Sequence, residues 1–255
     1  MKAGRMQRCI DYIKFNQEAE GFELSDEDEG DLRRLLDGEI SADTLVQDFL
    51  EKEQLADIAF IPQSADISYY KGTHCLINYF NIQERNLLRQ VAISLVSIRT
   101  AEMFIDPVTG YYDFDHLKSI HEHLFGDLYP SAGTTRTRLS AKRTEFCRPE
   151  YIEAQAKDIF DKLASDHFLR KMDRETFIND LAYYMGEIEA LHPFRSGNAP
   201  ATRLFFIDLI YQAGYRLEWG EADADRLLEA DICAIDGDYQ QLIDVLTELL
   251  NERED

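Results

Sequence analysis

The stretch LHPFRSGNAPATR, residues 191–203, is the most informative part of this sequence. A helical pattern rich in apolar residues ends at its His-Pro pair, because proline has no backbone N–H and crowds the preceding turn. A second helical pattern begins near Gly197. A loop that ends at a helix N-terminus presents free backbone N–H groups and the positive end of the helix dipole. This stretch therefore predicts a phosphate-binding loop.

Three side chains in the stretch suit that chemistry. Gly197 allows a ligand to approach the backbone closely. The planar guanidinium of Arg203, one to two turns into the second helix, could reach a terminal phosphate. His192 stands where it could accept a proton from an incoming hydroxyl group. The residues alone leave a second interpretation open, in which this is a helix–loop–helix corner where His192 caps a helix and Gly197 permits a turn.

Helical periodicity also dominates outside this stretch. The first 53 residues predict three short helices, with Gly21 ending the first and with Ser25 and Ser41 as N-caps of the next two. Longer helices are expected at about 83–102, 115–124, 149–164, 174–191, 197–214, 223–234 and 238–252. The interval 131–148 differs, because Thr and Ser alternate with basic residues there, and we expect a short hairpin or extended flap.

Composition excludes several classes of protein. The 255 residues carry a net charge of −22, which argues against a protein that wraps nucleic acid or binds membranes through basic residues. No apolar run is long enough to span a bilayer, and the N-terminus has no apolar segment typical of a secretory signal. The four cysteines lie far apart without a CxxC pair, which favours reduced thiols in the cytoplasm.

The same stretch resembles the signature of the Fic (Fido) family, His-Pro-Phe-x-(Asp/Glu)-Gly-Asn-Gly-Arg-x-x-Arg. The matching residues are His192, Pro193, Phe194, Gly197, Asn198 and Arg203. Three further segments resemble the family's entry segment, the segment before its target-binding flap and the flap itself: YYKGTHCLINYFNI (69–82), HEHLFGDLYPSAG (121–133) and TRTRLSAK (135–142). The resemblance implies an all-α fold, a Fic-type helical core with a small β-hairpin flap.

The family resemblance also implies an activity, the transfer of AMP from ATP to a hydroxyl side chain of a target protein. It would make His192 the general base and Arg203 the ligand of the γ-phosphate. Phe194, Gly197 and Asn198 would complete the nucleotide and phosphate site. The target, bearing a Ser, Thr or Tyr hydroxyl, would dock on the flap, residues 134–146.

Three positions depart from the signature. Ser196 occupies the position of the carboxylate that holds Mg²⁺, so no metal ligand is assigned and the use of Mg²⁺ is in doubt. Ala199 replaces the second glycine, and Pro200 replaces the first arginine. Losing these groups weakens charge stabilisation in phosphoryl chemistry. The alternative to an enzyme is therefore a catalytically degenerate Fic domain that binds a nucleotide or a protein.

The N-terminal unit resembles the small three-helix antitoxins that partner some Fic toxins. Its segment NQEAEG, residues 16–21, is similar to the family's inhibitory motif (Ser/Thr)-x-x-x-Glu-(Gly/Asn). The resemblance assigns Asn16, Glu20 and Gly21 to inhibition, with Glu20 paired to Arg203. The plain alternative is a solvated acidic helix end followed by a C-cap glycine.

This organisation gives three parts. We expect an antitoxin-like inhibitory unit at 1–53, a connector and entry segment at 54–82, and a Fic (Fido) domain at 83–255.

Overall fold

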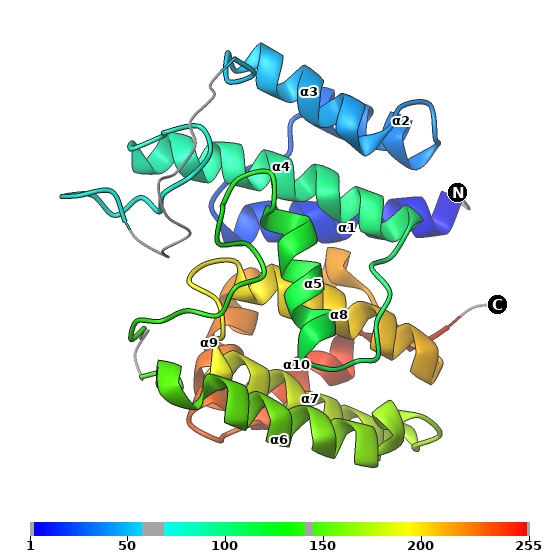
Figure 1. Cartoon of the computed structure of the whole chain (residues 1–255). Helices are drawn as coiled ribbons and strands as arrows, with labels where there is room; N and C mark the ends of the chain where they lie inside the picture. The colour runs from blue at the N-terminus through cyan, green and yellow to red at the C-terminus, as the bar shows by residue number, and fades with distance from the viewer. Residues whose placement is uncertain (1–2, 58–68, 141–144, 254–255) are drawn as a thin grey trace. The chain divides into compact units, whose positions relative to one another are not determined.

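The computed structural model describes residues 3–57, 69–140 and 145–253, and helices dominate them (Figure 1). Short 3-10 turns lie at Pro149–Tyr151, His167–Leu169 and Trp219–Glu221. The described residues form ten α-helices: α1 Ala3–Ala19, α2 Asp26–Leu36, α3 Ala42–Lys52, α4 Arg85–Ile105, α5 Phe114–Phe125, α6 Ile152–Ser165, α7 Arg174–Leu191, α8 Asn198–Ala213, α9 Ala224–Ile235 and α10 Gln240–Leu249.

The chain divides into two compact units. The first comprises Met1–Val108 and His121–Gly133. In it, α1, α2 and α3 each pack against α4, and α1 and α4 run side by side in Figure 1. Apolar side chains of α1 are almost wholly buried, because they recur on one helical face; they include Cys9, Ile10, Tyr12 and Ile13. The predicted helices of residues 1–53 are confirmed.

Local capping explains where these helices begin and end. The side chain of Ser25 accepts a hydrogen bond from Asp28 N–H, and that of Ser41 accepts one from Thr44 N–H, as expected for N-caps. Gly21, with φ of 76°, closes α1: its N–H and that of the next residue bond back to carbonyls of the last helical turn. This Schellman pattern requires a left-handed residue, which glycine supplies without steric cost.

The second unit comprises Thr109–Ile120 and Thr134–Asp255. Helix α7 lies at its centre and packs against α6, α8, α9 and α10. Its boundaries, Arg174–Leu191, agree with the prediction, because Asp173 caps the first turn and the His-Pro pair ends the last. The side chains of Phe205 and Phe206 in α8 are buried, and the Phe205 ring meets Phe160 of α6 edge-on. Thus α7 and α8 anchor both ends of the predicted phosphate loop.

A two-stranded antiparallel sheet corrects the prediction for the C-terminal segment. Strand β1, Tyr215–Leu217, pairs with β2, Leu250–Glu252, in a register that sets Arg216 opposite Asn251. The helix expected at 238–252 therefore ends at Leu249, and its last three residues are extended. Three residues are too few for strand alternation to be seen in a sequence, and the pairing partner lies far away along the chain.

The small sheet is thus present, but it does not lie in the flap. Among flap residues 134–140 and 145–146 no continuous strand forms, but Glu145 takes part in a single β-bridge. Phe146 N–H donates to Ser140 C=O over 3.1 Å and joins the two arms. The expected tip of the hairpin, 141–144, lies outside the described residues. What the structure shows here is two extended arms held together.

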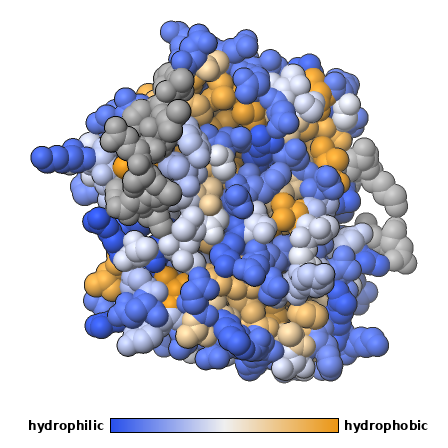
Figure 2. Space-filling model, viewed as in Figure 1, coloured by the Kyte–Doolittle hydropathy of each residue, from blue (hydrophilic) through white to orange (hydrophobic). Residues whose placement is uncertain are grey.

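Hydrophilic side chains cover much of the molecular face seen in Figure 2, with smaller apolar patches between them. This agrees with the excess of acidic residues in the sequence. No helix within 3–57, 69–140 and 145–253 is both long and apolar enough to cross a bilayer.

Candidate functional site

The loop between α7 and α8, residues 192–197 (the site loop), begins with an unusual backbone conformation. His192 is left-handed, with φ of 44° and ψ of 60°, and its N–H donates to Ile188 C=O over 3.0 Å. Left-handed geometry is costly for a residue with a Cβ, and a residue before proline normally prefers an extended conformation. Such strain persists only where surrounding contacts hold it, and it concentrates at functional sites.

Two side chains hold the imidazole of His192. The ring of Phe146, from the second arm of the flap, stacks on it with centroids 3.7 Å apart and planes 6° from parallel. On the α7 side, Oε1 of Glu189 lies 3.5 Å from Nδ1. The Glu189 side chain is 6% exposed and that of His192 13%, so the contact is shielded from water while an edge of the imidazole stays accessible.

The backbone of the same residue is held by Arg136, a flap residue that is only 1% exposed. Its guanidinium donates to the carbonyls of His192 (2.7 Å) and Leu191 (3.3 Å), at the C-terminus of α7. It also donates to the carbonyls of Arg138 (2.9 Å) and Cys147, one on each side of the flap's tip. Burial lowers the pKa of Arg136. The positive charge faces the negative end of the α7 dipole and ties the flap to the site loop.

Asn198 closes the site loop from its other end. Its side-chain amide donates to Phe194 C=O over 2.9 Å, and its Oδ1 accepts from Phe194 N–H over 2.8 Å. Both residues are buried. This reciprocal pair fixes the loop as a rigid turn. The Asn198 side chain therefore shapes the predicted phosphate cradle, while its backbone N–H belongs to the first turn of α8, where no helical carbonyl is available.

The start of α8 has the geometry expected of an anion site, with one donor fewer. Gly197 is the N-cap and is left-handed, with φ of 77°. Pro200 sits in the first turn and lacks an N–H, which is tolerated structurally but removes one candidate phosphate donor. Arg203 is half-buried one turn further on. These residues can receive a phosphate through backbone N–H groups and one guanidinium.

The donor set around the loop does not fit a hard divalent cation. Ser196 is exposed, and it offers a neutral hydroxyl where Mg²⁺ prefers carboxylate oxygen. No cluster of three or more His, Cys, Asp or Glu side chains suited to a metal occurs in the described residues.

The predicted inhibitory segment ends α1 in the first unit. Asn16 donates from its side chain to Tyr12 C=O over 2.8 Å. The Glu20 carboxylate lies 3.3 Å from Nη2 of Arg89, which also donates to the Glu20 carbonyl. Arg89 in turn lies over the ring of Phe22 at 5.2 Å. The carboxylate is 60% exposed, so it remains available to another cation, and its pairing with Arg203 stays a prediction.

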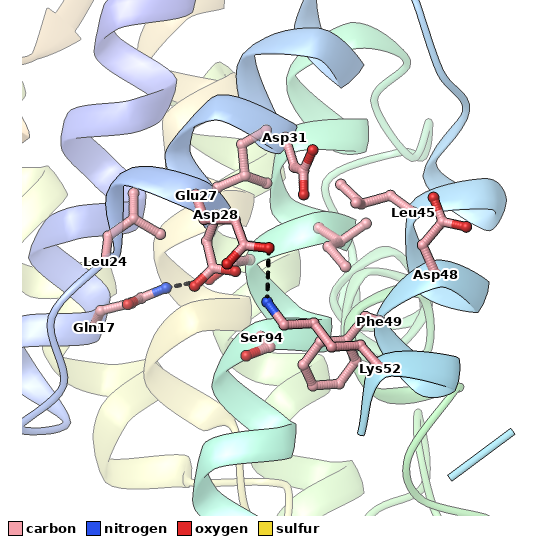
Figure 3. Close-up of a pocket in the computed structure, with 13 residues that line it drawn as sticks. Gln17, Leu24, Glu27, Asp28, Asp31, Leu45, Asp48, Phe49, Lys52 and Ser94 are labelled. Atoms are coloured by element: carbon pink, nitrogen blue, oxygen red, sulfur yellow. Dashed lines mark hydrogen bonds and ion pairs between the residues drawn. The ribbon is translucent and has the colours of Figure 1, made fainter. Parts of the chain in front are cut away.

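A cavity of about 180 Å³ lies within the first unit, among α1, α2, α3 and α4 (Figure 3). Leu24, Leu45 and Phe49 line it together with several carboxylates. Lys52 points across it to Glu27, 3.0 Å away. One cation among the carboxylates Glu27, Asp28, Asp31 and Asp48 makes the cavity unsuited to a phosphate.

Sequence reasoning missed the contributions of Arg136, Phe146 and Glu189. Arg136 lies in a polar, basic stretch, where a charged side chain is normally solvated. Phe146 meets His192 only because the chain folds back. The contact of Glu189 with His192 could have been predicted, because Glu189 lies three residues before His192 and an i, i+3 spacing puts both on one helical face.

Comparison with known families identifies two segments of the chain. A sequence model of the Fic/DOC family matches residues 111–210, which include the whole site loop. A model described as antitoxin VbhA matches residues 15–52, which include Asn16 and Glu20.

Two curated relatives match the chain closely. The chain is 37% identical over 175 residues to "Probable protein adenylyltransferase y4lH" of Sinorhizobium fredii, covering 68% of this chain and 90% of that protein. It is 35% identical over 161 residues to "Protein adenylyltransferase VbhT" of Bartonella schoenbuchensis, covering 63% of this chain but 34% of VbhT.

Among solved structures, BepC of Bartonella tribocorum with bound AMPPNP superimposes with a TM-score of 0.67. It is 24% identical to this chain, and the match covers 75% of this chain and 100% of that one. This similarity shows a common fold.

Proposed function

This chain belongs to the Fic/DOC family, and we propose that it is a protein adenylyltransferase that moves AMP from ATP to a hydroxyl side chain of a target protein. The resemblance inferred from the sequence is thereby confirmed for the Fic domain and for the antitoxin-like segment. The observation that carries the proposal is the strained His192, which Phe146 and Glu189 hold in place at the start of the loop that leads into α8. A base and an anion site on one short loop suit hydroxyl attack on a phosphate.

In the proposed reaction, the target hydroxyl oxygen attacks the α-phosphorus of ATP. The bond between that phosphorus and the bridging oxygen to the β-phosphate breaks, and pyrophosphate leaves. His192 takes the hydroxyl proton at Nε2. The N–H groups at the start of α8 stabilise negative charge on the phosphates, and the Arg203 guanidinium neutralises the γ-phosphate.

The target is proposed to dock along the flap, residues 134–146, as an added extended strand. Main-chain hydrogen bonds would align the hydroxyl with His192. This is supported by a hydrogen bond between the flap and the site loop, in which the backbone N–H of Arg136 donates to Pro193 C=O over 2.8 Å. Docking and chemistry would then share one rigid frame.

The N-terminal unit is proposed to restrain the enzyme. The proposed division into 1–53, 54–82 and 83–255 draws support from the two family matches, which cover residues 15–52 and 111–210. A Glu20 carboxylate at Arg203 would compete with the γ-phosphate for the same donors. We also propose a cytoplasmic location, because the four cysteines are widely spaced in the sequence and include no CxxC pair.

The test uses the full chain, its Glu20→Gly variant and the double variant Glu20→Gly/His192→Ala. Each is incubated with ATP labelled at the α-phosphate and cell lysate, in Mg²⁺, in Mn²⁺ or in EDTA. We expect labelled protein with Glu20→Gly, less with the parent, and none with the double variant. If no protein is labelled in any of the metal conditions, the proposed adenylyltransferase activity is wrong. If calorimetry shows that Glu20→Gly binds ATP with the same affinity as the parent, the proposal that Glu20 obstructs the nucleotide site is wrong.

A second function is favoured by Ser196 and Pro200, which remove a metal ligand and a phosphate donor from the loop. On this alternative the domain binds a nucleotide or a protein without turnover. It predicts ATP binding in calorimetry together with no label transfer in any of the conditions above.

A further inference from the structure

The imidazole of His192 has a defined neighbour on one ring face and another at Nδ1. Phe146 covers a face, and Nδ1 is buried and makes no hydrogen bond to any described residue. The carboxylate of Glu189 is the acidic group beside that nitrogen, at 3.5 Å. This is an ion-pair distance, longer than a formed hydrogen bond. Catalytic contacts are often long in empty sites and shorten when substrate is bound.

The position of the two residues at the end of α7 explains why they meet, and the burial of the carboxylate indicates that it needs a partner. Glu189 and His192 lie at i and i+3 at the end of α7, so their side chains project from one face. Glu189 lies among apolar residues in the sequence, including Ile188 and Leu191, and its charged side chain is buried with them. Burying a carboxylate costs free energy unless it is paired. The contact with the His192 imidazole is one interaction that can offset this cost.

We propose that Glu189 is a positioning residue for His192: its carboxylate accepts a hydrogen bond from Nδ1–H, which keeps the proton on Nδ1 and the lone pair on Nε2. This rests on the proposed function. When Nε2 takes the hydroxyl proton during attack on ATP, the ring becomes an imidazolium with both nitrogens protonated. The negative Glu189 then balances that charge, and the proton later leaves from Nε2 to solvent. The same logic operates for carboxylate–histidine pairs in other enzymes.

The first test reads the ring itself and needs no activity. The full chain is labelled with ¹⁵N-histidine, and His192→Ala identifies the His192 signals among the six histidines. We expect the Nδ1–H tautomer in the parent and a shift toward the Nε2–H tautomer in Glu189→Gln. An Nε2–H tautomer in the parent, or the same tautomer in both, overturns the proposal. Because no turnover is measured, this result stands even if adenylyl transfer fails.

The second test measures kinetics in the Glu20→Gly background. Glu189→Gln is expected to lower kcat at least about tenfold with little change in the KM for ATP. Glu189→Asp keeps the charge and should recover part of that loss. Glu187→Gln is the matched control, because Glu187 lies on the same helix but accepts from Tyr239 Oη at 2.6 Å. Equal effects of Glu187→Gln and Glu189→Gln, or a kcat within twofold of the parent, overturn the positioning role.

Discussion

Two helix ends in this protein each combine a left-handed residue with an arginine that donates to a backbone carbonyl, but they differ in the left-handed residue and in the burial of the arginine. Helix α1 ends in left-handed Gly21, and Arg89 donates to the nearby Glu20 carbonyl. Helix α7 ends in left-handed His192, and Arg136 donates to its carbonyl. At α1 the arginine side chain is 41% exposed, whereas Arg136 is 1% exposed and serves four carbonyls.

The difference shows how the cost of a left-handed residue is met. Glycine adopts that conformation freely, so the α1 end needs little support and can stay open to solvent. His192 cannot, so buried contacts from the flap and from α7 hold it in place. The first arrangement ends a helix, while the second fixes a side chain for chemistry. Substitutions at both ends should reveal this contrast in stability.

The largest effect is expected at Arg136. Arg136→Met leaves buried carbonyls without donors, and we expect the free energy of unfolding to fall by about 4 kcal/mol. Arg136→Lys should recover only part of this, because one ammonium cannot serve four carbonyls in a planar arrangement. Urea denaturation measures both. A loss below about 1 kcal/mol for Arg136→Met would mean that the buried cap is no stronger than a surface contact.

Asn198 should come next. Asn198→Ala removes both hydrogen bonds that close the site loop, and we expect a loss of about 2 kcal/mol. The matched control is Asn16→Ala in α1, where the amide bonds to a helical carbonyl one turn back. That change should cost less than about 0.5 kcal/mol. If Asn198→Ala and Asn16→Ala lower the free energy of unfolding equally, Asn198 does not stabilise the site loop as we infer.

A smaller effect is expected at Gly21. Gly21→Ala meets no neighbouring atom within 4 Å of the added Cβ, so its cost is purely conformational. We expect about 1 kcal/mol from forcing alanine into a left-handed conformation. Gly30→Ala is the control, because Gly30 lies inside α2 with equally open space and no left-handed φ. There alanine should stabilise the protein, so the two substitutions should have opposite signs.

The smallest effect is expected at Arg89. Arg89→Met removes an exposed ion pair and its bond to the end of α1, and we expect a loss below about 1 kcal/mol that shrinks further in high salt. Comparing its salt dependence with that of Arg136→Met sharpens the contrast between the two arginines. A large, salt-independent loss at Arg89 would show that the α1 end is also a rigid site.

Much of the helical framework could be predicted because its determinants are local. Ser25 and Ser41 are N-caps, Gly21 ends a helix, and α7 stops at the His-Pro pair, all through contacts within a few residues. The site loop was predictable for the same reason, since its residues are contiguous. The strands β1 and β2 were not, because each is three residues long and their pairing joins segments far apart in sequence.

By itself, then, the sequence determined the helices, their caps, the site loop and the family. Only the tertiary structure decided that Arg136 is a buried cap, that Phe146 stacks on His192, and that the small sheet lies outside the flap. The physical reason is range. Periodicity and capping act within a few residues, whereas burial of a charge or the stacking of two rings depends on which distant segments the fold brings into contact.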